Sequence, residues 1–260
     1  MRPILLEWGA LSLPSYVTLL SLGITALLWL GPSTARREGM AAGKVAALLG
    51  LLFLVGLAGA RGLFVLEHHR ILANPWKAAM SLAPGGLAAH GAFLLTIPVG
   101  FVLSQRLRLS PGAGADASVI GICVMGCLGR LGCFLAGCCY GRPTSLPWGV
   151  VFPETSEAAS RWGFGVPVHP TQIYEVVYLL AIAVVLGATR FQKRFEGEVF
   201  LKLVLFYSVA RFLSDFLRGD SLDSIWGRGP ASWMSLALIL ISGSVLIGSS
   251  SSLTEGRSRA

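Results

Sequence analysis

The chain has 260 residues, of which 54% are hydrophobic and only 13% are charged, and its formal net charge at pH 7 is +8. This composition leaves too little polar surface to cover a water-soluble globule of that length, so it excludes an ordinary soluble enzyme and indicates a protein whose solvent is lipid. The basic residues are spread over the predicted loops rather than grouped on one face, which argues against a nucleic-acid partner and favours an anionic lipid bilayer.

Apolar stretches of about 20 residues, the length that crosses about 30 Å of hydrocarbon, recur along the chain. No internal repeat, linker or second soluble domain interrupts them, so residues 1–260 are predicted to form a single transmembrane domain. The first residues lack a basic cluster and the first span has full membrane length, so we expect no cleavable signal peptide. We predict an all-α polytopic membrane protein with seven transmembrane helices, centred on residues 13–30, 45–66, 85–103, 117–135, 172–188, 199–216 and 231–249.

The distribution of arginine and lysine predicts the orientation of these spans. If the N-terminus is outside, ten basic residues fall in inner loops and seven in outer loops, and the inner loops are the shorter ones. We therefore expect the N-terminus outside and the C-terminus in the cytoplasm. Long outer segments then cover residues 67–84 and 138–171. The tryptophans and prolines of the second segment suit either a semi-rigid flap at the lipid interface or a simple interfacial anchor.

Four basic residues, Arg61, Arg130, Lys202 and Arg211, lie inside or at the edge of predicted spans. An arginine near the bilayer centre costs on the order of 3 kcal/mol, so each requires a carboxylate, a water-filled cavity or an anionic ligand. Lys202 is expected to snorkel to the cytoplasmic surface, and Arg211 is spaced for an ion pair with Asp215 on the same helical face. For Arg61 and Arg130 both an anionic ligand and an interhelical ion pair stay open. The candidate carboxylates for such a pair are Glu67, Asp116 and Glu175.

The five cysteines are Cys123, Cys127, Cys133, Cys138 and Cys139. They form no CxxC knuckle and have no histidine nearby in the sequence, so we expect no zinc site. Cys123 and Cys127 lie four residues apart in an apolar span and fit small core residues. For Cys133, Cys138 and Cys139 three roles stay open: a disulfide on the oxidising side of a membrane, a thiolate activated by a neighbouring arginine, or packing.

Two histidine-containing segments have the composition of a functional site. His90 lies in PGGLAAHGAF, where glycines allow close backbone approach and a neutral imidazole can accept a proton or donate a hydrogen bond; a histidine that only fills the core is the alternative. Residues 165–175, GVPVHPTQIYE, predict a turn fixed by two prolines, followed by a helix that Thr171 caps and that carries Tyr174 and Glu175 in its first turns. Such a helix N-terminus attracts anions.

Five motifs follow one another along the chain: HGA at His90, GRLGCF around Arg130, YGRP around Gly141, PVHPTQIYE from Pro167 and VARFLSDFLR around Arg211. This ordered set resembles the prolipoprotein diacylglyceryl transferase family. The matching segments of that family are HGG, GRxGNFxNGExxG, RHPSQLYE and a late arginine followed four residues on by glutamate. The resemblance covers nearly the whole chain, and the ordered combination is more specific than any one motif.

The resemblance implies a seven-helix enzyme of the bacterial inner membrane. It would transfer the diacylglyceryl group of phosphatidylglycerol to the lipobox cysteine in the signal peptide of a prolipoprotein, forming a thioether. Because the leaving group is glycerol phosphate, fixed arginines suit the charge that develops on phosphate oxygens. We expect neither a cofactor nor a metal ion. The expected catalytic residues are His90, Arg130 and Arg211. The expected substrate-binding residues are Arg61, Gly91, Gly141, His169, Tyr174, Glu175 and Asp215.

Four positions depart from the family pattern. Cys133 and Ala136 stand where the signature has asparagines, Cys138 stands where it has glutamate, and Asp215 replaces the late glutamate. Besides a lipoprotein transferase, these departures leave open a related lipid-dependent transferase with another acceptor and a lipid-binding protein without catalysis. A transporter is the alternative from a different class, because glycine-broken helices and charges at membrane depth also suit solute sites; the two halves show no paired broken helices, which argues against it.

Overall fold

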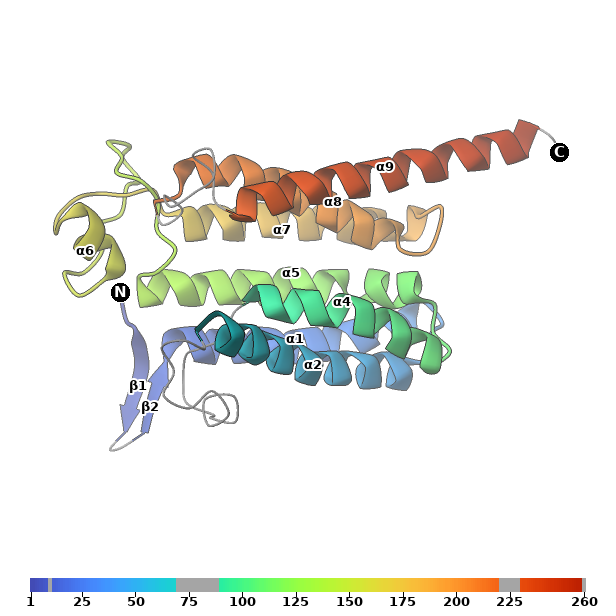
Figure 1. The fold of residues 1–260 in the computed structure, drawn as a ribbon, viewed down its shortest axis with the longest axis horizontal. Helices are drawn as coiled ribbons and strands as arrows, with labels where there is room; N and C mark the ends of the chain where they lie inside the picture. Colours follow the sequence, from blue (N-terminus) through green and yellow to red (C-terminus); the bar gives the residue numbers. More distant parts are fainter. Residues whose placement is uncertain (9–10, 69–88, 220–229, 259–260) are drawn as a thin grey trace. The chain divides into compact units, whose positions relative to one another are not determined.

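The computed structural model describes the backbone of residues 1–8, 11–68, 89–219 and 230–258 (Figure 1). Helices make up most of these segments. Within them, five helices are long and apolar enough to cross a membrane: Ser15–Arg37, Ala42–Leu66, Pro111–Ala136, Thr171–Gln192 and Ala231–Ser249. The chain is therefore a helical, multi-pass membrane protein, as its composition predicted.

The five helices coincide with the first, second, fourth, fifth and last predicted spans. The third prediction corresponds to a shorter apolar helix, α4 (Ala89–Arg106), and its residues 85–88 lie outside the described part of the chain. The sixth corresponds to α8 (Glu198–Ser214), which has 17 residues and carries charged side chains at Glu198, Lys202 and Arg211. Length and charge thus set α4 and α8 apart from the five long apolar helices.

An antiparallel hairpin precedes the first helix. Its strands are β1 (Ile4–Trp8) and β2 (Leu11–Pro14), with Glu7 opposite Ser12. The Ser15 hydroxyl donates to the Arg2 carbonyl and the Ser15 backbone N–H donates to the Pro3 carbonyl at 2.8 Å, which fastens the hairpin to the start of α1 (Ser15–Arg37). The all-α prediction missed these strands because a short apolar run does not distinguish a strand from a helix by periodicity.

The chain folds as two compact units, residues 31–117 and residues 1–30 together with 118–260. In the unit of residues 31–117, α2 (Ala42–His68) packs along α4. Gly59 and Gly91 meet at the crossing, where a Cβ atom on either residue would overlap the carbonyl oxygen of the other. Lipid chains are as apolar as the side chains, so close packing of small residues is what favours such a helix pair.

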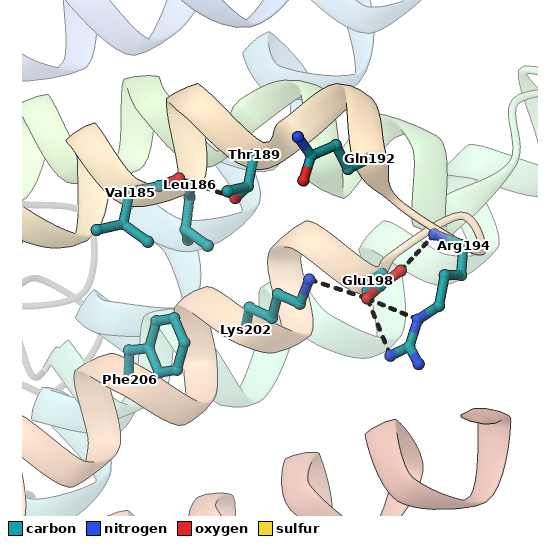
Figure 2. Close-up of a pocket in the computed structure, with 8 residues that line it drawn as sticks. All are labelled: Val185, Leu186, Thr189, Gln192, Arg194, Glu198, Lys202 and Phe206. Carbon is teal, nitrogen blue, oxygen red and sulfur yellow. Dashed lines mark hydrogen bonds and ion pairs between the residues drawn. The ribbon is translucent and has the colours of Figure 1, made fainter. Parts of the chain in front are cut away.

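In the larger unit, α7 (Thr171–Thr189) packs against α8, and α8 against α9 (Pro230–Ser258), and Figure 1 shows α8 beside both. A pocket of about 340 Å³ lies between α7 and α8 (Figure 2). On its wall the Glu198 carboxylate pairs with Lys202 at 2.9 Å and with Arg194 at 3.1 Å. Lys202, which was predicted to snorkel to the cytoplasmic surface, is only partly exposed. Its ammonium group is paired with the Glu198 carboxylate.

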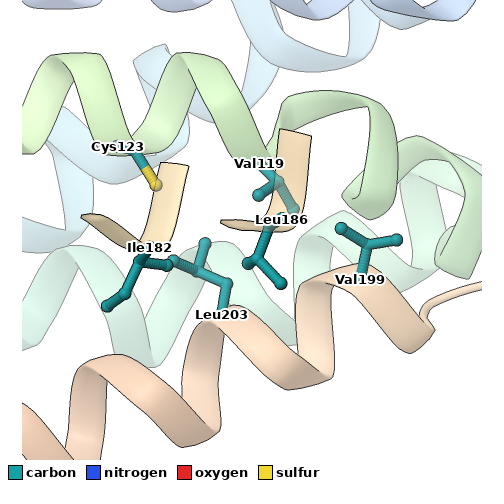
Figure 3. Packing of buried hydrophobic residues seen from close by; sticks show 6 residues of the cluster. All are labelled: Val119, Cys123, Ile182, Leu186, Val199 and Leu203. Atoms are coloured by element: carbon teal, nitrogen blue, oxygen red, sulfur yellow. The ribbon is translucent and has the colours of Figure 1, made fainter. Parts of the chain in front are cut away.

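The core of this unit contains two residues from each of three helices (Figure 3). On every helix the two residues are four apart, the spacing that places side chains on one face. Cys123 is fully buried here and Cys127 is buried one turn further along, as expected for small core residues. The six residues are Val119 and Cys123 from α5 (Pro111–Ala136), Ile182 and Leu186 from α7, and Val199 and Leu203 from α8.

The glycine crossing of α2 and α4 gives a first prediction. Gly59→Ala should destabilise the protein by about 1–3 kcal/mol, because the added methyl group forces the helices apart. The measurement is the thermal unfolding midpoint of the purified protein in detergent. Gly62→Ala is the matched control, since none of the described atoms lies within 4 Å of its Cβ position. Equal midpoints for the two variants would contradict the close crossing.

Candidate active site

Three helices of the larger unit meet at the carboxylate of Glu175. Glu175 lies on α7; the Nε of Arg130, on α5, is 2.9 Å from its Oε1 atom, and the hydroxyl of Tyr207, on α8, donates to the same oxygen at 2.7 Å. The Glu175 side chain is 4% exposed and that of Arg130 is 23% exposed. Of the two alternatives for Arg130, the structure shows the interhelical pair, and it leaves part of the guanidinium accessible.

A second ion-pair group lies at the end of α8. Arg211 donates to the Oδ1 atom of Asp215, as the spacing predicted, and the Ser232 hydroxyl, from α9, donates to Oδ2. The Nε atom of Arg218 lies 3.9 Å from Asp215 Oδ1. Asp215 and Arg218 are both buried. Asp215 therefore lies close to two guanidiniums. The sequence had predicted an ion pair only with Arg211.

The two ion-pair groups share the same pair of tyrosines. The rings of Tyr178 and Tyr207 contact edge to face with centroids 5.9 Å apart, and both hydroxyls interact electrostatically with Arg130 and with Arg211. In the described part of the chain, the buried Tyr178 hydroxyl has no hydrogen-bond partner. A buried polar group without a partner is costly, so this hydroxyl is suited to a ligand oxygen.

Four residues of this site were not predicted from the sequence: Tyr178, Tyr207, Arg218 and Ser232. Tyr207 lies four residues before Arg211 in the same helix, a spacing that places the two side chains on one face and was available as a signal. Arg218 lies three residues after Asp215, within the last motif, which is also a local spacing. The contacts of Tyr178 and Ser232 join different helices and have no comparable local pattern. The two groups bring three guanidiniums together, and guanidiniums are suited to bind an anionic group.

A backbone strap, residues 140–142, passes between two other segments beside this site. The Gly141 N–H donates to the His169 carbonyl at 3.0 Å, and the Arg142 N–H donates to the Leu217 carbonyl at 2.8 Å. A Cβ atom on Gly141 would lie 2.5 Å from the His169 Cβ atom and 2.8 Å from the Leu217 oxygen. Glycine is needed here because of close backbone approach, which gives the motif glycine a packing role.

His169 and Tyr174, both predicted to bind substrate, form a small polar chain at the start of α7. Trp148 donates from Nε1 to the Tyr174 hydroxyl at 2.8 Å, and His169 Nδ1 lies 3.1 Å from the same oxygen. The three side chains thus join the loop of residues 138–171 to the helix. The tryptophan partner comes from the loop of residues 138–171, for which the sequence predicted an interfacial position.

The predicted capping role of Thr171 is wrong. Pro170 occupies the N-cap position of α7 without a side-chain hydrogen bond, and Thr171 is the first helical residue. The Thr171 hydroxyl donates instead to the Cys139 carbonyl at 2.7 Å, and the Gln172 amide donates to the Cys138 carbonyl at 2.6 Å. The Thr171 hydroxyl therefore makes a tertiary hydrogen bond with the chain after α5 instead of capping α7.

Cys133, Cys138 and Cys139 lie together, with their sulfur atoms within 4.8 Å of one another, and all five cysteines are free thiols. Hydrogen bonds from Cys133 and Cys138 lower the pKa of the Cys139 thiol below its ordinary value; burial opposes this shift, and the charges of Arg130 and Arg218 reinforce it. The hydrogen bonds of Cys138 with the other two thiols, together with burial, raise the pKa of Cys138. The pKa values of Cys138 and Cys139 therefore shift in opposite directions.

The remaining predicted site residues belong to the unit of residues 31–117. Arg61 lies on α2 with its guanidinium carbon 5.7 Å from the centre of the Phe64 ring, and Gly91 packs against Gly59. The backbone of His90 is in the first turn of α4, but its side chain lies outside the described part of the molecule. The contacts around Glu175 and Asp215 are made within the larger unit.

A model of the family described as prolipoprotein diacylglyceryl transferase matches residues 3–248. This chain belongs to that family. Relatives named phosphatidylglycerol–prolipoprotein diacylglyceryl transferase include that of Clostridium tetani, 29% identical over 244 residues, which are 93% of this chain and 95% of the relative. That of Geobacter sulfurreducens is 31% identical over 221 residues, 83% of this chain and 82% of the relative. That of Clostridioides difficile is 30% identical over 207 residues, which are 80% of this chain and 79% of the relative.

Family membership confirms the resemblance that the ordered motifs indicated. In this prolipoprotein diacylglyceryl transferase family member, Arg130 of the GRLGCF motif and Glu175 of the PVHPTQIYE motif form one ion pair, and Arg211 and Asp215 of the last motif form another. Segments that are far apart in the sequence therefore supply a continuous group of charges. The pocket of Figure 2 lies toward the opposite ends of α7 and α8 and is separate from this group.

The strap gives a second prediction. Gly141→Ala should lower stability by about 1–3 kcal/mol and abolish activity, because the methyl group displaces the strap from His169 and Leu217. The measurements are the unfolding midpoint and the fraction of monodisperse protein after purification. Gly129→Ala is the control, because its Cβ atom would meet only ordinary contact, at 3.6 Å from Leu20. If Gly141→Ala is as stable as Gly129→Ala, the packing role is refuted.

Proposed function

We propose that this protein transfers the diacylglyceryl group of phosphatidylglycerol to the lipobox cysteine in the signal peptide of prolipoproteins. The observation that carries the proposal is the group of Arg130, Arg211 and Arg218 around two carboxylates, beside the buried Tyr178 hydroxyl, which has no hydrogen-bond partner among the described residues. A phosphate head group suits a site that offers several guanidinium donors and this hydroxyl. The family match and the names of the relatives point to the same reaction.

The reaction forms one bond and breaks one bond. The acceptor thiol sulfur attacks the glyceryl carbon that carries the phosphate, a carbon–sulfur bond forms, and the carbon–oxygen bond to glycerol phosphate breaks. Negative charge grows on the phosphate oxygens, which fixed guanidiniums stabilise in a site of low dielectric constant. The thiol proton leaves as the thioether forms, and His90 is the proposed acceptor. Glu175 and Asp215 fix the positions of the arginines.

The proposed topology places seven helices across the bacterial inner membrane, with the N-terminus outside and the C-terminus in the cytoplasm. α4 and α8 supply two spans in addition to the five long helices. The 3₁₀ helix η2 (Asp215–Leu217) directly continues α8, so the two together cover residues 198–217, close to the length that a span requires. Residues 1–260 then act as one transmembrane domain, and the loop of residues 138–171 receives the prolipoprotein from outside.

A related lipid-dependent transferase with another acceptor is the second candidate. Cys133 and Cys138 favour it, because they replace polar residues of the family signature next to the proposed phosphate site. Purified protein incubated with phosphatidylglycerol and a lipobox peptide distinguishes the candidates by mass spectrometry. A thioether product supports the first function. Phosphatidylglycerol turnover with the peptide unmodified supports the second, and bound lipid without turnover would support a lipid-binding protein.

Replacement of the arginines gives a third prediction. Arg130→Ala and Arg211→Ala should each reduce transfer at least 100-fold, the scale expected for loss of a charged transition-state contact. Lysine should substitute poorly because it lacks the planar fork that binds two phosphate oxygens. The measurement is thioether formation per folded protein. Arg106→Ala, at the exposed end of α4, is the control for loss of a positive charge.

A double variant distinguishes two roles of Arg130: binding the substrate phosphate and neutralising the Glu175 carboxylate. Arg130→Ala leaves a buried carboxylate without its cation, which costs about 3–5 kcal/mol, so part of any defect is structural. Arg130→Ala combined with Glu175→Gln removes that uncompensated charge and should recover stability but not transfer. Recovery of transfer together with stability would show that Arg130 serves only to neutralise Glu175.

The proposed topology gives a fourth prediction, tested by labelling engineered cysteines in a cysteine-depleted background. Ser156 lies in the outer loop but is buried, and its side chain caps α6 (Glu157–Trp162), so the exposed Glu154 is the better position. A membrane-impermeant maleimide should label Glu154→Cys in intact spheroplasts. Glu196→Cys, between α7 and α8, should be labelled only after permeabilisation. The reverse pattern would overturn the orientation.

A further inference from the structure

The helix end of α5 brings two thiols together. The Gly137 N–H donates to the Phe134 carbonyl at 3.3 Å, the Cys138 N–H donates to the Cys133 carbonyl at 3.1 Å, and Gly137 has a φ of +79°. This is the hydrogen-bond pattern of a Schellman motif, in which the side chains at the positions of Cys133 and Cys138 are brought into contact. The two cysteines therefore meet because of how the helix ends, although five residues separate them.

Cys139 completes the group through an unusual backbone conformation. Its φ is +61°, in the left-handed region, which is unfavourable for a residue with a side chain. The hydrogen bonds from Thr171 and Gln172 to the carbonyls of Cys139 and Cys138 hold the chain in this conformation. The start of α7 thus fixes the third thiol beside the other two.

The spacing of the sulfur atoms fits a metal ion. The three atoms lie within 4.8 Å of one another, and a tetrahedral zinc ion with Zn–S bonds of about 2.3 Å requires sulfurs about 3.8 Å apart. Small rotations about the Cα–Cβ bonds close this difference. Cys133 is buried, whereas Cys138 and Cys139 are partly exposed, so one side of the group is open to an entering ion and to a fourth ligand.

The surrounding charges and acceptors also suit a bound ion. Three thiolates around a divalent cation carry one net negative charge, and the guanidiniums of Arg130 and Arg218 both interact with the Cys139 thiol. The Gln172 side chain is 1% exposed, and its Oε1 atom has no hydrogen-bond partner among the described residues. It is an unused buried acceptor on the side chain that already binds the Cys138 carbonyl, available to a water ligand.

We propose that Cys133, Cys138 and Cys139 form a binding site for a thiophilic divalent metal ion of the zinc type, held by three thiolates and one exchangeable ligand. The expectation of no zinc site rested on the absence of CxxC spacing and of a histidine nearby in the sequence. Here the end of α5 and the left-handed conformation of Cys139 bring the three thiols together, as a CxxC knuckle does in other zinc sites. The site goes beyond the transferase reaction and does not depend on it.

The test is a titration of the reduced, full-length protein in detergent with Co²⁺ under anaerobic conditions. One Co²⁺ per chain should bind with sulfur-to-cobalt charge-transfer absorption and the strong visible bands of a tetrahedral site, and Zn²⁺ should displace it. Cys133→Ser and Cys139→Gly should weaken binding by at least 10-fold, on the scale of lost metal-site contacts. Glycine adopts the left-handed conformation freely, so Cys139→Gly removes the thiol while preserving the turn.

Cys127→Ser is the matched control, because Cys127 lies on the same helix but outside the three-thiol group, and it should bind Co²⁺ as the parent does. Unfolding midpoints measured without metal identify any variant that fails to fold. The proposal is overturned if the reduced parent, with its thiols titratable, gives no charge-transfer band, or if Cys139→Gly binds Co²⁺ with unchanged affinity. A disulfide in this group whose reduction fails to restore Co²⁺ binding would overturn it as well. Transfer to a lipobox peptide is assayed separately, so failure here leaves the transferase function standing.

Discussion

One buried carboxylate, Glu175, sets the geometry on which the site depends. It accepts from Arg130 on α5 and from Tyr207 on α8 while lying on α7, so three helices converge on a single oxygen atom. Burying such a pair costs desolvation energy that the attraction only partly offsets, so its main contribution is position rather than stability. A guanidinium has five N–H donors, and the bond to Glu175 leaves others for an anionic ligand.

Asp215 has the same role at the end of α8. It accepts from Arg211 and from Ser232 of α9, and Arg218 lies beside it. Each of these arginines has a carboxylate nearby that partly neutralises its charge. The energetic cost of keeping several arginines at low dielectric constant is therefore reduced even before a substrate binds. Guanidiniums held in this way suit a phosphate group, so the same arrangement serves the folded protein and the proposed reaction.

Close packing and hydrogen bonds connect this charged group to the loop of residues 138–171. Gly141 allows the strap to pass against His169 and Leu217, and Thr171 and Gln172 hold the carbonyls of the chain that leaves α5. Two residues that depart from the family signature, Cys133 and Cys138, lie at this junction. The loss of polar groups from the signature is therefore accompanied by a new group of thiols at the place where the helix ends.

The sequence by itself determined the parts of this protein that depend on local patterns. Hydropathy and length predicted the long helices, the i, i+4 spacing predicted the pair of Arg211 and Asp215, and the ordered motifs identified the family. Only the tertiary structure selected Glu175 as the partner of Arg130 and showed the N-terminal hairpin. It also brought Tyr178 and Ser232 to the motif residues, and it placed Cys139 beside the other two thiols through hydrogen bonds from the start of α7. These contacts depend on which faces of distant helices and turns meet, and no short-range pattern of residue types encodes that meeting.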